Sequence, residues 1–196
     1  MSTPVLHVLA GPNGSGKSTL AERVLQPVTG LTFVNADVIA AATWPGEELV
    51  HAYEASRLAA EERERLLAAN ASFITETVFS HPSKAELVDR AGRRGYLVHL
   101  HVVLVPVDLA AARVLDRVDR GGHAVPEDKL RARFERLWPL VTTAAGQADR
   151  VTLYDNARAG RPFRVVGELE HGVPVGRHDL PAWTPPPLAG LWGAGA

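Results

Sequence analysis

Residues 11–18 read Gly11-Pro12-Asn13-Gly14-Ser15-Gly16-Lys17-Ser18 and match the pattern G-x-x-x-x-G-K-[ST] at every fixed position. A short apolar run, Val5 to Ala10, precedes this octapeptide, and apolar residues at helical spacing follow it from Lys17 to Pro27. A strand, a glycine-rich turn and a helix in this order are the context that a phosphate-binding loop requires. The sequence therefore predicts a P-loop.

The residue types of this loop indicate its chemistry. Its glycines let backbone N–H groups turn inward around an anion, at the positive end of the following helix. We expect Lys17 to reach the β- and γ-phosphates of a nucleotide, and the hydroxyl of Ser18 to ligate a metal ion. The expected cofactors are ATP and Mg²⁺. The predicted nucleotide-binding residues are Gly11, Pro12, Asn13, Gly14, Ser15, Gly16, Lys17, Ser18 and Thr19.

The composition limits the class of protein. With 196 residues, 46% of them apolar and 22% charged, the chain fits one packed globular domain and excludes an intrinsically disordered protein. The 21 basic and 22 acidic side chains nearly cancel, so a net charge of -1 gives no overall field that could hold a nucleic acid or an anionic membrane. The absence of cysteine excludes disulfides, thiolate zinc sites and cysteine nucleophiles. Recognition of charge must therefore be local.

The hydrophobic pattern indicates neither a membrane span nor a secretory signal. The longest nearly apolar run, Leu97 to Val107, is short for a span and contains His99 and His101. The beginning of the chain lacks a basic segment followed by an apolar stretch and a cleavage site. We therefore expect a cytoplasmic protein.

Strand-like and helix-like segments alternate along the chain, which predicts an α/β fold with a mainly parallel sheet covered by helices on both faces. With the P-loop, this is a P-loop kinase-like three-layer fold. After the first strand, the expected strands are 31–34, 72–75, 96–105 and 151–154. After the first helix, the expected helices are 47–70, 84–94, 108–118 and 127–146.

The end of the chain differs in composition. Pro174, Pro181 and the run Pro185-Pro186-Pro187, with several glycines, predict little regular structure. We therefore divide the chain into a kinase domain, residues 1–160, and a proline-rich extension or tail, residues 161–196.

Acidic side chains follow two of the expected strands. In an open parallel sheet the ligand lies outside the carboxyl ends of the strands, and Asp37 and Glu76 stand just past such ends. A kinase acting on a hydroxyl needs a carboxylate to orient the acceptor and take its proton, so Asp37 is the candidate base. Glu76 could hold a metal-bound water or bind the acceptor, with Thr77 and Ser80 donating hydrogen bonds beside it. The alternatives are a helix N-cap for Asp37 and an ordinary strand-end carboxylate for Glu76.

Basic residues concentrate between Arg113 and Arg136, where seven of the 21 lie. Arg113 and Arg117 are four residues apart and share a helix face, and Arg120 follows at a Gly-Gly loop. This arrangement predicts a helical lid that brings guanidinium groups onto the γ-phosphate. The alternative is a solvated helix face with Glu–Arg pairs. Asp108, at the start of the first of these helices, is interpreted as its N-cap and left out of the site.

Two histidines alternate on one expected strand. His99 and His101 therefore share a face, as a metal pair does, but no third ligand stands nearby in the sequence, so a packing role is favoured. His123, in the loop of the lid, is an open candidate for a ligand contact.

Taken together, several segments resemble the zeta-toxin family of P-loop kinases, in its short chromosomal, stand-alone branch. The resemblance covers about residues 4 to 157. Its most specific part is the Gly-Gly-His-x-Val-Pro-Glu segment. The segments are 9–19, Asn35-Ala36-Asp37, Glu76-Thr77, Gly121-Gly122-His123-Ala124-Val125-Pro126-Glu127 and Tyr154-Asp155-Asn156.

The resemblance implies ATP-dependent phosphorylation of a hydroxyl on a UDP-activated amino sugar, typically UDP-N-acetylglucosamine. It implies that Lys17 and Ser18 bind phosphate and metal and that Asp37 is the base. Asp155 and Asn156 are implied to lie near the adenine, with a turn role as the alternative. The implied contacts to the sugar nucleotide are Glu76 and Thr77, and the full predicted acceptor site also includes Asn35, Asp37 and Ser80. The implied phosphate clamp is Arg117, Arg120, Arg131 and Arg133. An antitoxin, not visible within this chain, is a possible protein partner.

Two other classes of function remain as alternatives. The first is a nucleotide-dependent switch or a transport ATPase, because such proteins carry the same P-loop sequence motif. Against it, the chain lacks a Ser-Gly-Gly-Gln signature and lacks four apolar residues leading into an Asp-Glu pair. The second is a kinase for another metabolite or for a nucleic-acid end.

Overall fold

The computed structural model describes residues 3–76, 79, 83–118 and 127–193. In this part of the chain, seven strands form one sheet with the order β2-β3-β1-β4-β5-β6-β7. The strands β1 to β5 pair in parallel, whereas β6 and β7 are antiparallel to their neighbours. The predicted mainly parallel α/β sheet is confirmed. The strands are β1 Val5–Ala10, β2 Thr32–Val34, β3 Phe73–Glu76, β4 Leu97–Leu104, β5 Arg150–Asp155, β6 Arg164–Glu170 and β7 Val173–Val175.

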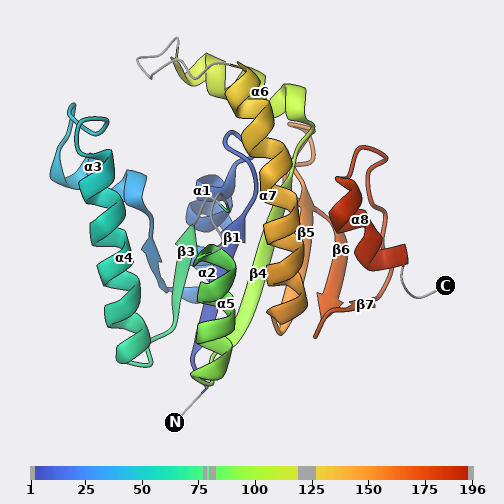
Figure 1. Ribbon diagram of the computed structural model, residues 1–196, viewed down its shortest axis with the longest axis horizontal. Helices are drawn as coiled ribbons and strands as arrows, with labels where there is room; N and C mark the ends of the chain where they lie inside the picture. The colour runs from blue at the N-terminus through green and yellow to red at the C-terminus, as the bar shows by residue number, and fades with distance from the viewer. Residues whose placement is uncertain (1–2, 77–78, 80–82, 119–126, 194–196) are drawn as a thin grey trace.

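Helices cover both faces of the sheet (Figure 1). The helices α4, α5 and α7 lie in front of the sheet in this view, and α1 and α2 lie behind it. The helical segments are α1 Lys17–Leu20, the π-helix η1 Ala21–Leu25, α2 Gln26–Thr29, α3 Ala36–Thr43, α4 Ala52–Ala68, α5 Ser83–Arg93, α6 Val107–Val118, α7 Glu127–Gln147 and α8 Pro186–Gly193.

The helix after the P-loop is less regular than the sequence predicts. A π-helical turn, Ala21–Leu25, separates α1 from α2, and Pro27 lies in the first turn of α2. Proline cannot donate the backbone hydrogen bond to the carbonyl four residues earlier, and its ring clashes there. The widened turn accommodates this missing bond.

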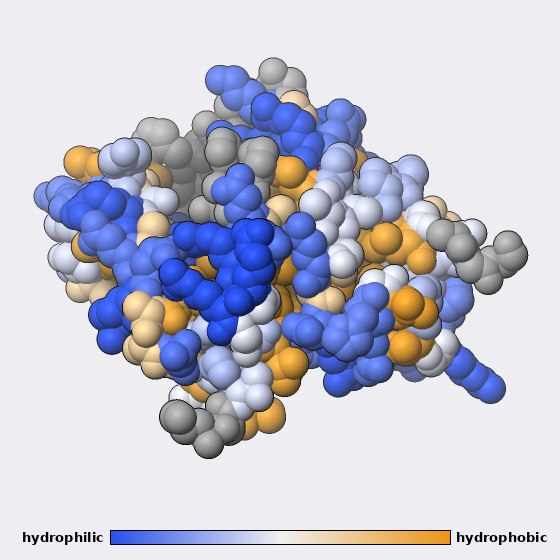
Figure 2. All heavy atoms as spheres, turned by 60° about the horizontal axis from the view of Figure 1, so that its bottom comes forward, coloured by the Kyte–Doolittle hydropathy of each residue, from blue (hydrophilic) through white to orange (hydrophobic). Residues whose placement is uncertain are grey.

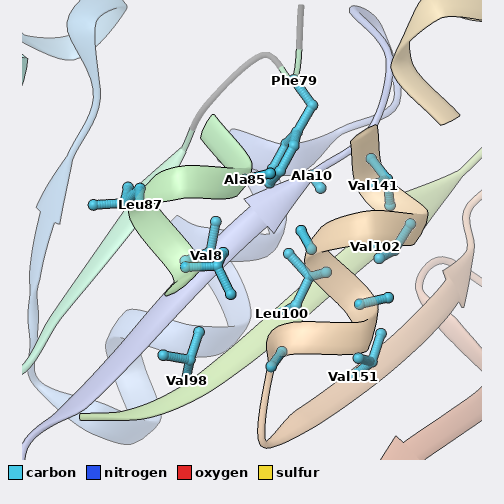
Figure 3. Close-up of a cluster of buried hydrophobic side chains, with 14 of the residues drawn as sticks. Val8, Ala10, Phe79, Ala85, Leu87, Val98, Leu100, Val102, Val141 and Val151 are labelled. Carbon is cyan, nitrogen blue, oxygen red and sulfur yellow. The ribbon is translucent and has the colours of Figure 1, made fainter. Parts of the chain in front are cut away.

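The main core lies between the sheet and the helices of its front face (Figure 3). Val8 and Ala10 of β1 and Leu100 and Val102 of β4 point toward α5 and α7, where Val141 packs against them. The opposite side chains of the same strands form a smaller core with the helix after the P-loop. That core contains Leu9, Leu20, Ala21, Leu25, Ile74 and Val103.

The prediction of little regular structure in residues 161–196 is wrong. The antiparallel strands β6 and β7 extend the sheet beyond β5, and α8 packs on α7 and β7. Its Leu188 is fully buried in the main core. Pro186 and Pro187 form the first turn of α8, because proline is favoured in a first helical turn where no N–H partner is needed, and Pro174 lies within β7. The carbonyl of Pro185 accepts hydrogen bonds from the N–H groups of Leu188 and Ala189.

The surface seen from the amino ends of the strands is largely hydrophilic, with apolar atoms scattered in small areas (Figure 2). Among the described residues, every helix is too short or too polar to cross a bilayer.

Candidate active site

The P-loop wraps tightly around the start of α1. Gly11 and Gly16 have φ angles of 143° and 97°, a backbone region that side chains rarely adopt. A Cβ atom on Gly11 would lie 2.5 Å from the carbonyl oxygen of Val103, and one on Gly16 would lie 2.6 Å from Nδ2 of Asn156. The glycines of the motif are therefore required by both the conformation and the close approach of neighbouring strands.

Lys17 is buried although it carries a charge. Its Nζ donates a hydrogen bond to the carbonyl oxygen of Pro12 at 3.0 Å and lies 3.4 Å from Oε1 of Glu76. A buried ammonium group requires such partners because loss of its hydration is costly. The side chain of Lys17 therefore folds back over the loop, where a phosphate group would lie.

Glu76 joins three elements at the carboxyl end of the sheet. Its Oε2 accepts hydrogen bonds from Oγ of Ser18 at 2.6 Å and from Nδ2 of Asn35 at 2.8 Å. The contact arises because β3, which ends in Glu76, is the direct neighbour of β1. The carboxylate thus lies beside Lys17 and Ser18, the two P-loop side chains that are predicted to bind phosphate and metal.

Asn35 caps α3 in place of Asp37. Its Oδ1 accepts from the backbone N–H groups of Asp37 at 2.7 Å and Val38 at 3.4 Å, and it is the N-cap of α3. Asp37 lies one residue into the first turn of α3, and its side chain is exposed. The cap interpretation of Asp37 is wrong, and its carboxylate is left facing solvent at the end of β2. Thr77 and Ser80 lie outside the described residues.

Two contacts that the sequence does not indicate hold the P-loop from its other side. Asn156, just after β5, donates from Nδ2 to the carbonyl oxygen of Ser15 at 2.8 Å. Arg113 of α6 donates to the carbonyl oxygens of Gly14 at 3.3 Å and Asn156 at 3.0 Å. Arg113, expected in the lid, braces the loop instead, and Asp155 accepts from the N–H of Ala157 at 2.9 Å, as the alternative turn role predicts.

The lid arginines fall into separate environments. Arg131 donates to Oδ1 of Asp108 at 2.6 Å. Asp108 lies inside the first turn of α6, which begins at Val107, so its interpretation as the N-cap is wrong. Arg133 lines a pocket beside the P-loop. Arg120 and His123, and the side chain of Arg117, lie outside the described part of the chain.

This pocket lies between the P-loop, α6 and α7 and has mostly apolar walls, with Arg133 supplying a cation. Phe79, which follows β3, closes one side of it. The other lining residues are Pro12, Asn13, Val107, Ala110, Ala111, Val114, Leu130, Phe134 and Leu137.

The loop fits a magnesium nucleotide. Oγ of Ser15 is buried and makes no hydrogen bond with any described residue, so it is an unsatisfied polar group at the centre of the loop. The buried ammonium group of Lys17 and the hydroxyl of Ser18 lie beside it along α1. Ser18 and Glu76 supply oxygen atoms, the ligands that Mg²⁺ prefers.

Comparison with known proteins agrees with this geometry. An uncharacterised protein of Haemophilus influenzae is 30% identical over 125 residues, which are 63% of this chain and 88% of the relative. A chain from the PezAT chromosomal toxin–antitoxin system of Streptococcus pneumoniae superimposes with a TM-score of 0.65 at 14% identity, covering 86% of this chain and 72% of the other. The AvrRxo1-ORF1:-ORF2 structure with ATP gives 0.66 at 19% identity, covering 88% of this chain and 60% of the other.

The sequence signature of the zeta toxin family matches residues 1–161, which is most of the chain and includes the P-loop, Asp37, Glu76 and the lid segment. The protein therefore belongs to the zeta toxin family and is an ATP-dependent P-loop kinase.

Proposed function

We propose that the protein transfers the γ-phosphate of ATP to a hydroxyl of a UDP-activated amino sugar, with UDP-N-acetylglucosamine as the first candidate. The observation that carries this proposal is the convergence of Lys17, Ser18 and Asn35 on Glu76 at the carboxyl end of the sheet. A kinase needs phosphate and metal ligands within reach of an acceptor site, and this edge of the sheet combines them.

In this proposal the P-loop side chains hold the phosphates. The Lys17 ammonium stabilises the negative charge of the β- and γ-phosphates, and Ser18 with Glu76 would hold Mg²⁺, directly or through water. The bound metal ion would supply charge neutralisation at the phosphoryl oxygens. Asn156 and Arg113 keep the loop carbonyls of Gly14 and Ser15 turned away from the anion by hydrogen-bonding them.

Asp37 is proposed as the general base. It lies in the first turn of α3, three residues after the end of β2, whose neighbour β3 ends in Glu76. Its exposed carboxylate is available to orient an acceptor hydroxyl and take its proton. Asn35 caps α3 and so fixes the position of the helical turn that carries Asp37. We propose that Asn35 both positions Asp37 and contacts the acceptor.

The pocket supports an acceptor that is itself a nucleotide. Its walls are apolar and aromatic, with Phe79 and Phe134, and Arg133 supplies a cation. Such a surface suits a flat base linked to phosphate better than a plain polyhydroxy sugar, which needs many hydrogen-bonding groups. Arg117, Arg120, Arg131, Thr77 and Ser80 are proposed to complete the phosphate clamp and acceptor site.

We further propose an antitoxin partner and a cytoplasmic location. Two structural neighbours come from a toxin–antitoxin system and from a two-protein complex, which supports a search for a neutralising protein. Cytoplasm is where ATP and sugar nucleotides are available together.

The test is a transfer assay with ATP, Mg²⁺ and a panel of UDP-sugars, free sugars and nucleic-acid ends, followed by mass spectrometry of the product. We expect one phosphate added to a UDP-amino sugar. Asp37→Asn should lower turnover about 10²- to 10⁴-fold with ATP affinity retained. Asp89→Asn, which removes a surface carboxylate of α5, is the matched control. Transfer only to acceptors without UDP would contradict the proposal that the acceptor is a UDP-amino sugar. ATP hydrolysis without phosphorylation of any acceptor would contradict the proposed phosphate transfer.

A further inference from the structure

Strand pairing brings a third histidine to the two that alternate on β4. His7 of β1 stands directly opposite His99 in the parallel register, and His101 stands opposite Leu9. One ring nitrogen from each of His7, His99 and His101 lies within 4.8 Å of the other two. The closest pair, Nδ1 of His7 and Nε2 of His101, is 2.9 Å apart. The packing role favoured from the sequence rested on the lack of a third ligand, and the fold supplies one.

The cluster can be reached from solvent. These side chains lie on the face of the sheet opposite the main core, the face on which Leu9 contacts the helix after the P-loop. His101 is 1% exposed, whereas His7 and His99 are only partly buried. The cluster therefore has a buried base and an open side.

Neighbouring hydroxyl groups on β5 fix two of the rings. Nε2 of His99 lies 2.9 Å from Oγ1 of Thr152, and Nδ1 of His101 lies 3.1 Å from the hydroxyl of Tyr154. Each neutral imidazole has one N–H and one lone pair, so an outer hydrogen bond on one nitrogen leaves the other as a ligand. In His101, the nitrogen left over is the one that faces His7.

Burial favours the uncharged form of each ring. Burial lowers the pKa of His7, lowers that of His99 to about 3, and lowers that of His101 well below its ordinary value. Neutral imidazole is the ligand form of histidine. In the metal-free chain one of the two facing nitrogens of His7 and His101 carries the proton and donates to the other at 2.9 Å. A metal ion bound there replaces this hydrogen bond, and the proton moves to the other nitrogen of the same ring.

We propose that His7, His99 and His101 form a binding site for a divalent transition-metal ion, with Zn²⁺ the preferred occupant and water in the remaining position. Three histidines and an open position are a known zinc ligand set, and imidazole suits zinc better than it suits Mg²⁺. Zn–N bonds of about 2.0–2.1 Å in a tetrahedral site require nitrogens about 3.3 Å apart. The closest pair must therefore separate by a few tenths of an ångström while the wider pairs close.

This site differs in chemistry and position from the P-loop. Ser18 and Glu76 offer oxygen atoms at the carboxyl end of the strands, whereas the histidines lie further back along β1 and β4. A bound ion would join β1 to β4, and Tyr154 would connect it to β5 just before Asp155 and Asn156. We expect it to stabilise the central sheet rather than to take part in phosphate transfer.

The first experiment measures zinc binding to the metal-free full-length chain in excess Mg²⁺. We expect one Zn²⁺ per chain, and Co²⁺ in its place should give the visible absorption of a tetrahedral nitrogen site. His7→Gln and His99→Gln should each weaken zinc binding by at least about 100-fold, since each removes a ligand. Tyr154→Phe should weaken it by about 10- to 100-fold, as expected for an outer partner. His171→Gln, on an exposed turn, and Ser18→Ala should leave it unchanged.

A second measurement works without variants. In the wild-type protein, zinc should shift the NMR signals of three histidine rings together at one equivalent. The proposal is overturned if no zinc binds, if both His7→Gln and His99→Gln bind it as wild type does, or if the shifts are confined to other histidines. Circular dichroism identifies a variant that fails to fold, in which case the wild-type spectra decide.

Discussion

The P-loop end of the sheet and the C-terminal segment β6-β7-α8 flank the same central strands but are built in opposite ways. At the P-loop, an ammonium group and an unsatisfied hydroxyl are buried, and glycines hold conformations that side chains rarely adopt. In the C-terminal segment, Val166, Leu169 and Leu188 are buried apolar side chains within the main core. The P-loop end thus buries a charged group and a polar group, whereas the C-terminal segment buries mostly apolar side chains, with Nε1 of Trp192 as a buried polar atom that makes no hydrogen bond to a described residue.

The difference shows how this fold separates activity from stability. Buried polar groups without full partners lower stability and are retained where they bind a ligand. Buried leucine and valine side chains contribute about 1.5–3 kcal/mol each. We therefore expect substitutions at the P-loop to change catalysis with little effect on unfolding, and substitutions in the C-terminal segment to do the reverse.

The largest effect is expected for Lys17→Ala. Loss of the buried ammonium removes charge stabilisation of the transferring phosphate, so kcat/KM should fall by about 10³-fold or more, equivalent to about 4 kcal/mol. The free energy of unfolding should change by less than about 1 kcal/mol, because the variant removes the cost of burying the ammonium group and the Glu76 carboxylate keeps its hydrogen bonds from Ser18 and Asn35. Lys129→Ala, an exposed lysine of α7, is the control in both the transfer assay and urea denaturation. A large loss of stability in Lys17→Ala contradicts the separation.

The second effect is expected for Leu188→Ala. Truncating a fully buried leucine leaves a cavity between α8, α7 and the sheet, so the free energy of unfolding should fall by about 3 kcal/mol. Turnover measured well below the unfolding temperature should stay within about twofold of wild type. Leu49→Ala is the matched control because Leu49 is 57% exposed, and we expect a change below about 0.5 kcal/mol there. If catalysis in Leu188→Ala falls as it does in Lys17→Ala, the C-terminal segment takes part in the site.

The P-loop could be predicted from the sequence because its eight residues are contiguous and the strand and helix beside it have regular patterns. The C-terminal segment could not, because its prolines and glycines dominate the composition while only a few apolar residues reveal β6. Leu188 is buried through contacts with α7, which is distant in the sequence. The start of α8 at Pro186 depends on proline being favourable in a first turn, whereas the same residues elsewhere indicate a loop.

In the candidate site, too, features that depend on neighbouring residues in the sequence could be predicted, and contacts that depend on strand pairing could not. The position of Glu76 past a strand end predicted that it lies near the P-loop, but its hydrogen bond to Ser18, 58 residues away, depends on β3 pairing with β1. The support of the loop by Arg113 and Asn156 has no local pattern at all. His7 is likewise a single histidine in the sequence and becomes one of three only through the register of β1 and β4.

A third effect is expected for Asn156→Ala, which leaves the buried carbonyl of Ser15 without its donor. The loss should amount to about 2 kcal/mol, divided between unfolding and nucleotide binding, with the KM for ATP raised about tenfold. Ser72→Ala is the matched control, because Ser72 accepts from the N–H of Val5 at 2.9 Å at the opposite end of β1. Calorimetry with ATP and thermal unfolding separate the two. If both variants lose only stability and bind ATP as wild type does, Asn156 stabilises the fold and does not contribute to ATP binding.

The smallest effect on stability is expected for Arg131→Ala, in the predicted lid segment. Arg131 pairs with Asp108, whose side chain is 80% exposed, and an ion pair at such a surface contributes about 0–1 kcal/mol because water screens it. A double-mutant cycle of Arg131→Ala with Asp108→Ala should therefore give a coupling below about 1 kcal/mol in urea denaturation.

The transfer assay tests whether either arginine acts in catalysis. It compares Arg131→Ala with Arg133→Ala, which removes the arginine that lines the pocket. We expect a larger rise in acceptor KM for Arg133→Ala than any kinetic change for Arg131→Ala, since only Arg133 lines that pocket. A loss in kcat for Arg131→Ala that approaches that of Lys17→Ala would mean that this arginine leaves Asp108 to clamp the phosphates. Arg131 would then act in catalysis together with the P-loop, although it lies at the surface.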